Sequence, residues 1–296
     1  ISTIANCFLD DFLTTRQRNS GTSLIDLLKP MSQPKYRIYP SILDKYQKFL
    51  DSELVAEEFW NKDSDDNYKL TPDEMSDMLE QELIDSINRV DRVASEAADK
   101  GTAFNEIVDC ILEQRDTERN DILLHSTKED IKALFNDWDF SLDINLCKNV
   151  ALYFWGCIPQ YTCSAILPTA YGDVELYGHV DYIGINKIFD LKTTKQYQFG
   201  NYSKYWQRHL YPYCLIESGE MEEVKEFEFT VIKWQERKNK PISGEVYKEV
   251  YTYSHDKSKE QLTAICESFI EWLEANRDKI TDKKIFGGEN DEVPCD

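Results

Sequence analysis

Three stretches in the middle of the chain alternate apolar with polar residues, which is the pattern of half-buried β-strands. They cover residues 161–169, 174–183 and 187–192, and β-branched and aromatic side chains supply most of their apolar positions. Short runs that favour turns separate the stretches at 171–173 and 184–186. The pattern therefore predicts a β-meander, in which each strand pairs with the next.

Helical spacing dominates on both sides of this meander. Residues 1–40 form a helical or irregular lead-in, and residues 41–98 are charged and helical, with a helix start at Thr71. The other predicted elements are helices at 90–114, 202–218 and 257–277 and strands at 226–234 and 245–253. This order predicts an α/β fold with a mixed sheet flanked by helices. We expect residues 1–98 to form a helical N-terminal region packed on a core of residues 99–296.

The composition suits a packed globular protein. Of the 296 residues, 41% are hydrophobic and 12% aromatic, and no apolar run approaches the roughly 18 residues that a membrane span needs. The eight cysteines include no C-x-x-C pair, which argues against a zinc ribbon or an iron–sulfur frame and for buried, reduced thiols. These features predict a cytoplasmic protein without membrane association.

The net charge of −21 argues against a protein that coats nucleic acid through bulk electrostatics. The charge is uneven, however. Residues 187–208 contain Asp190 as their single acid among five cations, which are Lys187, Lys192, Lys195, Lys204 and Arg208. This segment therefore leaves room for a local basic face on an acidic body.

Candidate chemistry lies on the last two strands of the predicted meander. Asp190 and Lys192 are two residues apart and so project from the same face of one strand. The preceding strand carries Asp181, and the hairpin between the strands can bring the two carboxylates together. Paired carboxylates suit Mg²⁺ or Mn²⁺, and the Leu191 carbonyl offers a further oxygen ligand. Metal-assisted phosphodiester hydrolysis needs this set, with Lys192 acting on the attacking water or on the developing negative charge.

In these residues the chain resembles the PD-(D/E)XK nuclease superfamily, especially its RecB-like exonuclease branch, over residues 101–234. Asp181 and Asp190-Leu191-Lys192 match the superfamily's acidic residue and D/E-x-K pair. Gln207 and Tyr211 match the Q-x-x-x-Y motif of the branch and lie one helical turn apart. The resemblance implies a restriction-endonuclease-like core, with Gln207 and Tyr211 positioning DNA or the active site.

The branch also has an upstream helix of the form G-T-x-x-H-x-x-x-E, which corresponds to the segment starting at Gly101. Asn105 stands where the family usually has a metal-binding histidine, and Asp109 where it has glutamate. A helical wheel places Asn105 and Asp109 together at the edge of the buried arc, whereas Glu106 points away. Asn105 and Asp109 are therefore candidate metal ligands or neighbours of ligands, and Glu106 is the fallback.

The roles of His179 and of a set of aromatic residues each have two interpretations. His179 is on the same strand face as Asp181 and is either a general base or a side chain that shapes the site. Five aromatic residues follow the predicted strand of residues 187–192, namely Tyr197, Phe199, Tyr202, Tyr205 and Trp206. They either stack on single-stranded or frayed DNA or belong to the hydrophobic core.

The function predicted from these features is metal-dependent cleavage of linear DNA, duplex or single-stranded, by an exonuclease of recombination, repair or phage DNA processing. Two alternatives stay open: a catalytically weakened nucleic-acid-binding module of the same fold, and a defence-type endonuclease. The sequence has no Walker-type phosphate loop, so a helicase or recombination motor would be a partner. Nothing in the pattern predicts a particular oligomeric state.

Overall fold

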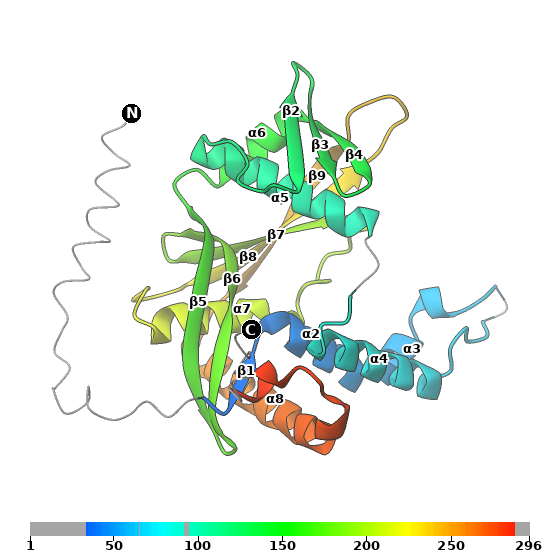
Figure 1. Cartoon of the computed structure of the whole chain (residues 1–296), viewed down its shortest axis with the longest axis vertical. Coiled ribbons are helices and arrows are strands. Elements are labelled where there is room, and N and C mark those ends of the chain that lie inside the picture. The colour runs from blue at the N-terminus through cyan, green and yellow to red at the C-terminus, as the bar shows by residue number, and fades with distance from the viewer. Residues whose placement is uncertain (1–33, 65, 92–94, 288–296) are drawn as a thin grey trace, which may run out of the picture. The chain divides into compact units, whose positions relative to one another are not determined.

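The computed structural model describes residues 34–64, 66–91 and 95–287. This part of the chain forms two β-sheets with helices around them (Figure 1). The strands of the larger sheet are β1 (Tyr36–Ile38), β5 (Ile158–Thr169), β6 (Gly172–Gly184), β7 (Lys187–Thr194), β8 (Glu226–Gln235) and β9 (Ser243–Thr252). The longer helices are α2 (Pro40–Leu50), α4 (Pro72–Ile87), α5 (Glu96–Glu113), α6 (Ile144–Tyr153), α7 (Gln207–Glu217) and α8 (His255–Ala275). Shorter helical segments are α3 (Ser52–Ala56), η2 (Phe59–Asn61), η3 (Arg277–Lys279) and η4 (Lys283–Phe286).

The two edges of β6 have different partners in the larger sheet. One edge pairs antiparallel with β5 across residues 172–183. The other edge pairs in parallel with β1 at residues 174–176 and antiparallel with β7 at residues 182–184. β7 pairs in parallel with β8, which pairs antiparallel with β9. The sheet is therefore mixed, and the predicted meander of β5, β6 and β7 is confirmed.

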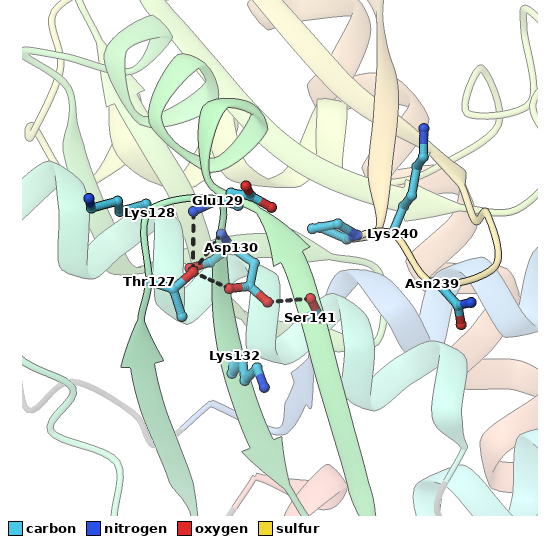
Figure 2. A pocket seen from close by; sticks show the side chains of 9 residues that line it. Thr127, Lys128, Glu129, Asp130, Lys132, Ser141, Asn239 and Lys240 are labelled. Carbon is cyan, nitrogen blue, oxygen red and sulfur yellow. Dashed lines mark hydrogen bonds between the residues drawn. The ribbon is translucent and has the colours of Figure 1, made fainter.

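The smaller sheet consists of β2 (Ile122–Ser126), β3 (Asp130–Phe135) and β4 (Trp138–Asp143), paired antiparallel in that order. The turn between β2 and β3 is closed by Asp130, whose carboxylate accepts hydrogen bonds from Thr127 Oγ1 and, at 2.5 Å, from Ser141 Oγ (Figure 2). These bonds fix the start of β3 against β4 and give the hairpin a rigid base.

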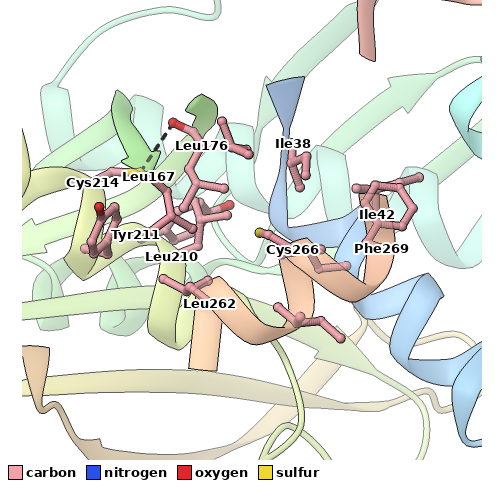
Figure 3. Close-up of a cluster of buried hydrophobic side chains, with 14 of the residues drawn as sticks. Ile38, Ile42, Leu167, Leu176, Leu210, Tyr211, Cys214, Leu262, Cys266 and Phe269 are labelled. Atoms are coloured by element: carbon pink, nitrogen blue, oxygen red, sulfur yellow. Dashed lines mark hydrogen bonds between the residues drawn. The ribbon is translucent and has the colours of Figure 1, made fainter. Parts of the chain in front are cut away.

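Buried side chains cover both faces of the larger sheet. On one face, α2, α7 and α8 contribute Ile42, Leu210 and Phe269 to a cluster with the sheet residue Leu176 (Figure 3). On the other face, α5 and α6 pack on β6, β7 and β8 in a second cluster that also includes side chains of β3 and β4. Helices on both faces of a mixed sheet form the α/β architecture that the pattern predicts.

Several predicted elements agree with the structure and others differ. The helix start at Thr71 is confirmed by a capping box, in which Thr71 N donates to Glu74 Oε2 at 2.9 Å. The helix predicted from residue 202 begins only at Gln207, because residues 201–204 form turns, and its N-cap residue Trp206 donates its N–H to Asp44 Oδ1. The smaller sheet, β1 and α6 are additional elements. Residues 1–33 of the predicted lead-in lie outside the described residues.

The six cysteines within the described ranges are free thiols, and all but the half-buried Cys157 are buried, as the sequence predicts for reduced cysteines. No helix among the described residues combines the length and the apolar character that crossing a membrane requires.

Candidate active site

The larger sheet has a gap beside β6. On the edge of β6 that carries β1 and β7, pairing stops after Leu176 and resumes at Tyr182, so residues 177–181 have no register partner there in the described chain. The β6–β7 ladder ends at the pair Tyr182–Phe189, one position before Asp181 and Asp190 would face each other. The predicted hairpin therefore brings the two acids to the point where the strands separate.

Asp181 closes the end of this gap. Its Oδ2 accepts a hydrogen bond of 2.7 Å from Leu191 N, a group that a continuing ladder would present to the backbone of β6. The Leu191 carbonyl points to the same side of β7 as its N–H, and hence toward the gap. Burial, together with the negative charge of Asp190, raises the pKa of Asp181 to about 8, against the opposing effects of Lys192 and the Leu191 N–H.

Lys192 links Asp190 to helix α7. Its Nζ lies 2.7 Å from Asp190 Oδ2 and donates to Gln207 Oε1 at 2.7 Å. Gln207 Nε2 donates in turn to Tyr211 Oη at 3.3 Å. Burial opposes the charge on Lys192, but Asp190 and Asp181 outweigh it and raise its pKa. Four of the five predicted catalytic residues thus form one chain of contacts on the α7 side of β7, and Asp181 lies beside it.

Two close contacts hold α7 against the gap. A Cβ at Gly178 would lie 2.6 Å from Tyr211 Cε1, so only glycine lets this ring rest on the unpaired part of β6. At the helix start, Asp44 Oδ1 accepts from Trp206 N at 2.7 Å, next to Gln207. Burial, with a smaller contribution from Asp190, raises the pKa of Asp44 to about 7. Asp44 is a residue of the site that the sequence motifs miss, because it comes from the N-terminal region.

Helix α5 crosses the other face of the sheet at the same place. At its start, a Cβ on Gly101 would lie 2.7 Å from Thr193 Oγ1 of β7. Two turns later, Asp109 accepts from Tyr182 Oη at 2.6 Å and from Gln160 Nε2 at 3.0 Å. Asn105 lies midway on the same helix face, which places it over the junction of β7 and β6. Its Oδ1 is buried and accepts no hydrogen bond from the described residues.

The β5 side of Asp181 is also irregular. The β5–β6 register pairs Pro159 with Tyr182 and Tyr161 with Val180, but omits Gln160, which would face Asp181. Gln160 has a φ of 47°, in the left-handed region that non-glycine residues rarely adopt. This conformation accompanies its hydrogen bond to Asp109. Backbone strain of this kind gathers at functional sites, because the surrounding structure has to enforce it.

The donors around the gap suit a hard divalent cation. Asp181 and Asp190 supply carboxylates, and Leu191 and Asn105 supply neutral oxygens. Mg²⁺ is usually bound by one or two carboxylates and retains several waters. Among the residues that the structure describes, no three His, Cys, Asp or Glu side chains lie close enough together to hold a metal ion. The arrangement therefore fits an ion bound by two carboxylates and water, and does not fit a cage made entirely of protein side chains.

The remaining acidic candidates are engaged in hydrogen bonds. Both carboxylate oxygens of Asp109 accept hydrogen bonds, and burial raises its pKa to about 6. Its predicted role as a metal ligand stays a prediction. Glu106 pairs with Arg115 at 3.0 Å and accepts a hydrogen bond from Cys110 Sγ.

His179 is exposed, and its Nδ1 lies 3.0 Å from Thr162 Oγ1. The sequence leaves two interpretations for the aromatic residues after β7, stacking on DNA or packing in the core, and their exposure differs. Tyr202 is buried and stacks on Phe229 at 5.3 Å, whereas Phe199 is 77% exposed.

Three of the five cations in residues 187–208, where the sequence leaves room for a basic face, form ion pairs. Lys187 pairs with Glu226 and Glu228, Lys192 with Asp190, and Lys204 with Asp51. Acids of β8 and of the α2 C-cap, distant in sequence, thus offset part of the local positive charge, while Lys195 and Arg208 form no ion pair with the described residues.

No protein-family model and no curated protein matches the chain. One solved structure, described as "Crystal structure of SSO0001", aligns with 90% of this chain and 86% of that chain, at 10% sequence identity and a TM-score of 0.39. This likeness is too weak to establish a common fold or to transfer any residue. The geometry of the site is what supports a function for this chain.

Proposed function

We propose that this protein is a divalent-metal-dependent DNA nuclease with a PD-(D/E)XK type active site on a restriction-endonuclease-like core. The observation that carries the proposal is the gap in the sheet beside residues 177–181, where Asp181, Asp190 and Lys192 meet at an unpaired strand edge. An acid such as Asp181, whose pKa is raised by burial and by a neighbouring carboxylate, destabilises a fold and is typical of functional sites that bind cations.

Each residue has a role that follows from its contacts. A divalent cation held by Asp181 and Asp190 would neutralise charge on the scissile phosphate and lower the pKa of an attacking water. Lys192, whose Nζ lies 2.7 Å from Asp190 Oδ2, would act on the attacking water or stabilise the developing negative charge. Gln207 accepts from Lys192 and donates to Tyr211, and it therefore fixes the direction of the Lys192 ammonium group.

DNA is the substrate that the resemblance to the RecB-like branch favours, and exonucleolytic processing in recombination, repair or phage replication is the corresponding reaction. Phe199 agrees with this substrate, because an exposed aromatic ring close to the end of β7 can stack on an unpaired base.

The direct test is cleavage of linear duplex, linear single-stranded and closed circular DNA with Mg²⁺ or Mn²⁺, beside the variant Lys192→Ala. We expect degradation of linear DNA only, and its loss in the variant. Cleavage of circular DNA would indicate a defence-type endonuclease. Absence of cleavage by folded protein, with either metal, would contradict the proposal and favour a non-catalytic DNA-binding module.

A further inference from the structure

Unpaired cations gather at the smaller sheet, away from the candidate active site. Lys128 in the β2–β3 turn, Lys132 on β3 and Lys240 in the β8–β9 loop line a hollow of about 540 Å³ (Figure 2). We call these three lysines the basic rim. Arg237 and Lys238 extend the loop's positive charge. All five side chains are exposed, and none forms an ion pair with the residues that the structure describes.

This concentration of free cations is notable in a chain of net charge −21. Around the active site, by comparison, three of the five cations of residues 187–208 are paired with acids, namely Lys187, Lys192 and Lys204. Lysines that are not held in an ion pair can contact an anionic partner, although the charge of Lys132 also acts on Asp130 in the same hollow.

The centre of the hollow excludes a small anion as the natural occupant. Asp130 occupies it, with its carboxylate bonded to Ser141 and Thr127, and these bonds lower its pKa so that it stays charged. Glu129 adds a second negative charge to the lining. The lysines lie on different sides of this bonded centre (Figure 2). An extended polyanion that crosses the rim can contact the lysines without entering the space beside Asp130 and Glu129. A phosphate-sized ion in the centre would lie next to these two acids.

The position of the rim relates it to the active site through β8. Phe229 of β8 is the register partner of Asp190, and the strand runs on to Gln235, where the basic loop begins. Six residues at about 3.3 Å each correspond to roughly 20 Å, or about six base pairs of duplex DNA at 3.4 Å each. The start of the loop that carries Lys240 thus lies about half a helical turn of DNA beyond the register partner of Asp190.

We propose that the basic rim binds the phosphate backbone of a duplex whose end lies in the candidate active site. The position of that end rests on the proposed nuclease function. The contact to phosphates rests on the lysines alone, so the two can be tested separately.

The experiment measures DNA binding without cleavage, by fluorescence anisotropy in EDTA. The probes are labelled DNA hairpins with stems of about 5 and about 20 base pairs, one shorter and one longer than the distance from site to rim. Wild-type protein is compared with Lys128→Gln/Lys132→Gln/Lys240→Gln. The control, Lys48→Gln/Lys257→Gln/Lys259→Gln, makes the same charge change at exposed lysines of α2 and α8 that have no ion pair in the described chain. Thermal unfolding verifies that both variants fold.

For the long hairpin we expect the rim variant to lose on the order of tenfold in affinity and to reduce the slope of log K against log salt by about 3, one per lysine. The short hairpin should bind both variants alike. Equal losses in the rim and control variants would overturn the inference, since only net charge would matter. An equal loss for short and long hairpins, or displacement of DNA by millimolar inorganic phosphate, would also overturn it.

Failure of the proposed function has a different signature. If wild-type protein cleaves nothing with Mg²⁺ or Mn²⁺ but shows the rim-dependent, length-dependent binding described above, the nuclease proposal fails and the rim stands as a DNA-binding surface.

Discussion

Strand β7 has one edge that is fully paired and one that is open, and the acids beside the two edges are stabilised differently. Toward β8, register pairing runs from Lys187 to Thr194. Toward β6, it stops at Phe189, so the backbone of Leu191 meets the side chain of Asp181 and not a neighbouring strand. The same strand therefore builds a continuous sheet on one side and a candidate active site on the other.

Glu228 of β8 represents the paired side. It is 1% exposed, and it accepts hydrogen bonds from Tyr153 Oη at 2.9 and 3.0 Å and from Thr230 Oγ1 at 2.8 Å. Lys187 Nζ lies 2.9 Å from it. Asp181 at the open side receives the Leu191 N–H but also lies beside the charge of Asp190. Burial alone therefore does not distinguish a candidate functional acid from a structural one. What distinguishes them is whether the fold supplies the carboxylate with a complete set of hydrogen-bond donors.

The sharpest test of this comparison is the same change made on both sides of β7. In Asp190→Asn we expect cleavage to fall by about 1000-fold or more, because a ligand charge and the partner of Lys192 are lost together. In Glu228→Gln we expect cleavage within about twofold of wild type, but a free energy of unfolding lower by about 1–3 kcal/mol, because Lys187 loses a buried charged partner. Steady-state cleavage of linear DNA and chemical denaturation provide the two readouts.

The comparison fails if the two variants behave alike. A Glu228→Gln protein that is stable but inactive would place this acid in the chemistry, and an active Asp190→Asn protein would remove Asp190 from it.

The next largest effect concerns the part of β6 that pairs with β5 but has no register partner on its other edge in the described chain. Gly178→Ala places a methyl group 2.6 Å from the present position of Tyr211 Cε1, so the ring or the helix must move. We expect a loss of about 2 kcal/mol in the free energy of unfolding from overpacking, together with slower cleavage, because Tyr211 and Gln207 shift with α7. Thermal unfolding and cleavage assays measure both. Unchanged values for both would show that the gap tolerates a side chain and that Tyr211 is not held there.

The strands that carry the site could be predicted because their evidence is local. Alternation with period two places Asp190 and Lys192 on one face, and the turn at residues 184–186 sets Asp181 on the neighbouring strand. The gap between the strands could not be predicted in this way. It depends on β1 pairing with only part of β6 and on Tyr211 resting on Gly178, contacts between segments that are far apart in sequence.

The smaller sheet shows a different kind of omission, since its signal is present in the sequence. Ile131, Ala133 and Phe135 occupy alternate, buried positions, with Lys132 and the exposed Leu134 between them, and Asn136, with a φ of 51°, starts the turn into β4. Asp44 shows the opposite case. Nothing near residue 44 indicates a link to the catalytic strand, because its partner Trp206 is 162 residues away.

A smaller effect follows from the raised pKa of Asp181. Between the ordinary carboxyl range and about pH 8, folded protein holds a proton that unfolded protein has released, so this group makes the free energy of unfolding fall as the pH rises. Asp44 and Asp109 contribute in the same direction, up to about pH 7 and about pH 6.

A divalent cation replaces the proton on Asp181, so we expect Mg²⁺ or Mn²⁺ to raise the melting temperature more at pH 8.5 than at pH 6. Asp181→Asn should raise the metal-free melting temperature by about 2–4 °C, the equivalent of about 1 kcal/mol, and should weaken the effect of metal. Melting curves at the two pH values, with EDTA and with metal, provide the measurement. A metal effect that is the same in Asp181→Asn as in wild type would place the cation elsewhere.

The smallest expected effect separates positioning from charge at Asp44. Its Oδ1 holds the Trp206 N–H and thereby the start of α7, one residue before Gln207. Asp44→Ala removes this bond, worth about 1 kcal/mol, and we expect roughly a fivefold slower cleavage through misplacement of Gln207. Asp44→Asn keeps an oxygen acceptor and should restore most of the rate, since the charge next to Lys192 is not what Gln207 requires. If Asp44→Asn cleaved as slowly as Asp44→Ala and shifted the pH profile of cleavage, Asp44 would act through its charge on Asp190 and Lys192. Asp44 would then be a third acid, beside Asp181 and Asp190, that contributes to the chemistry at the open edge of β7.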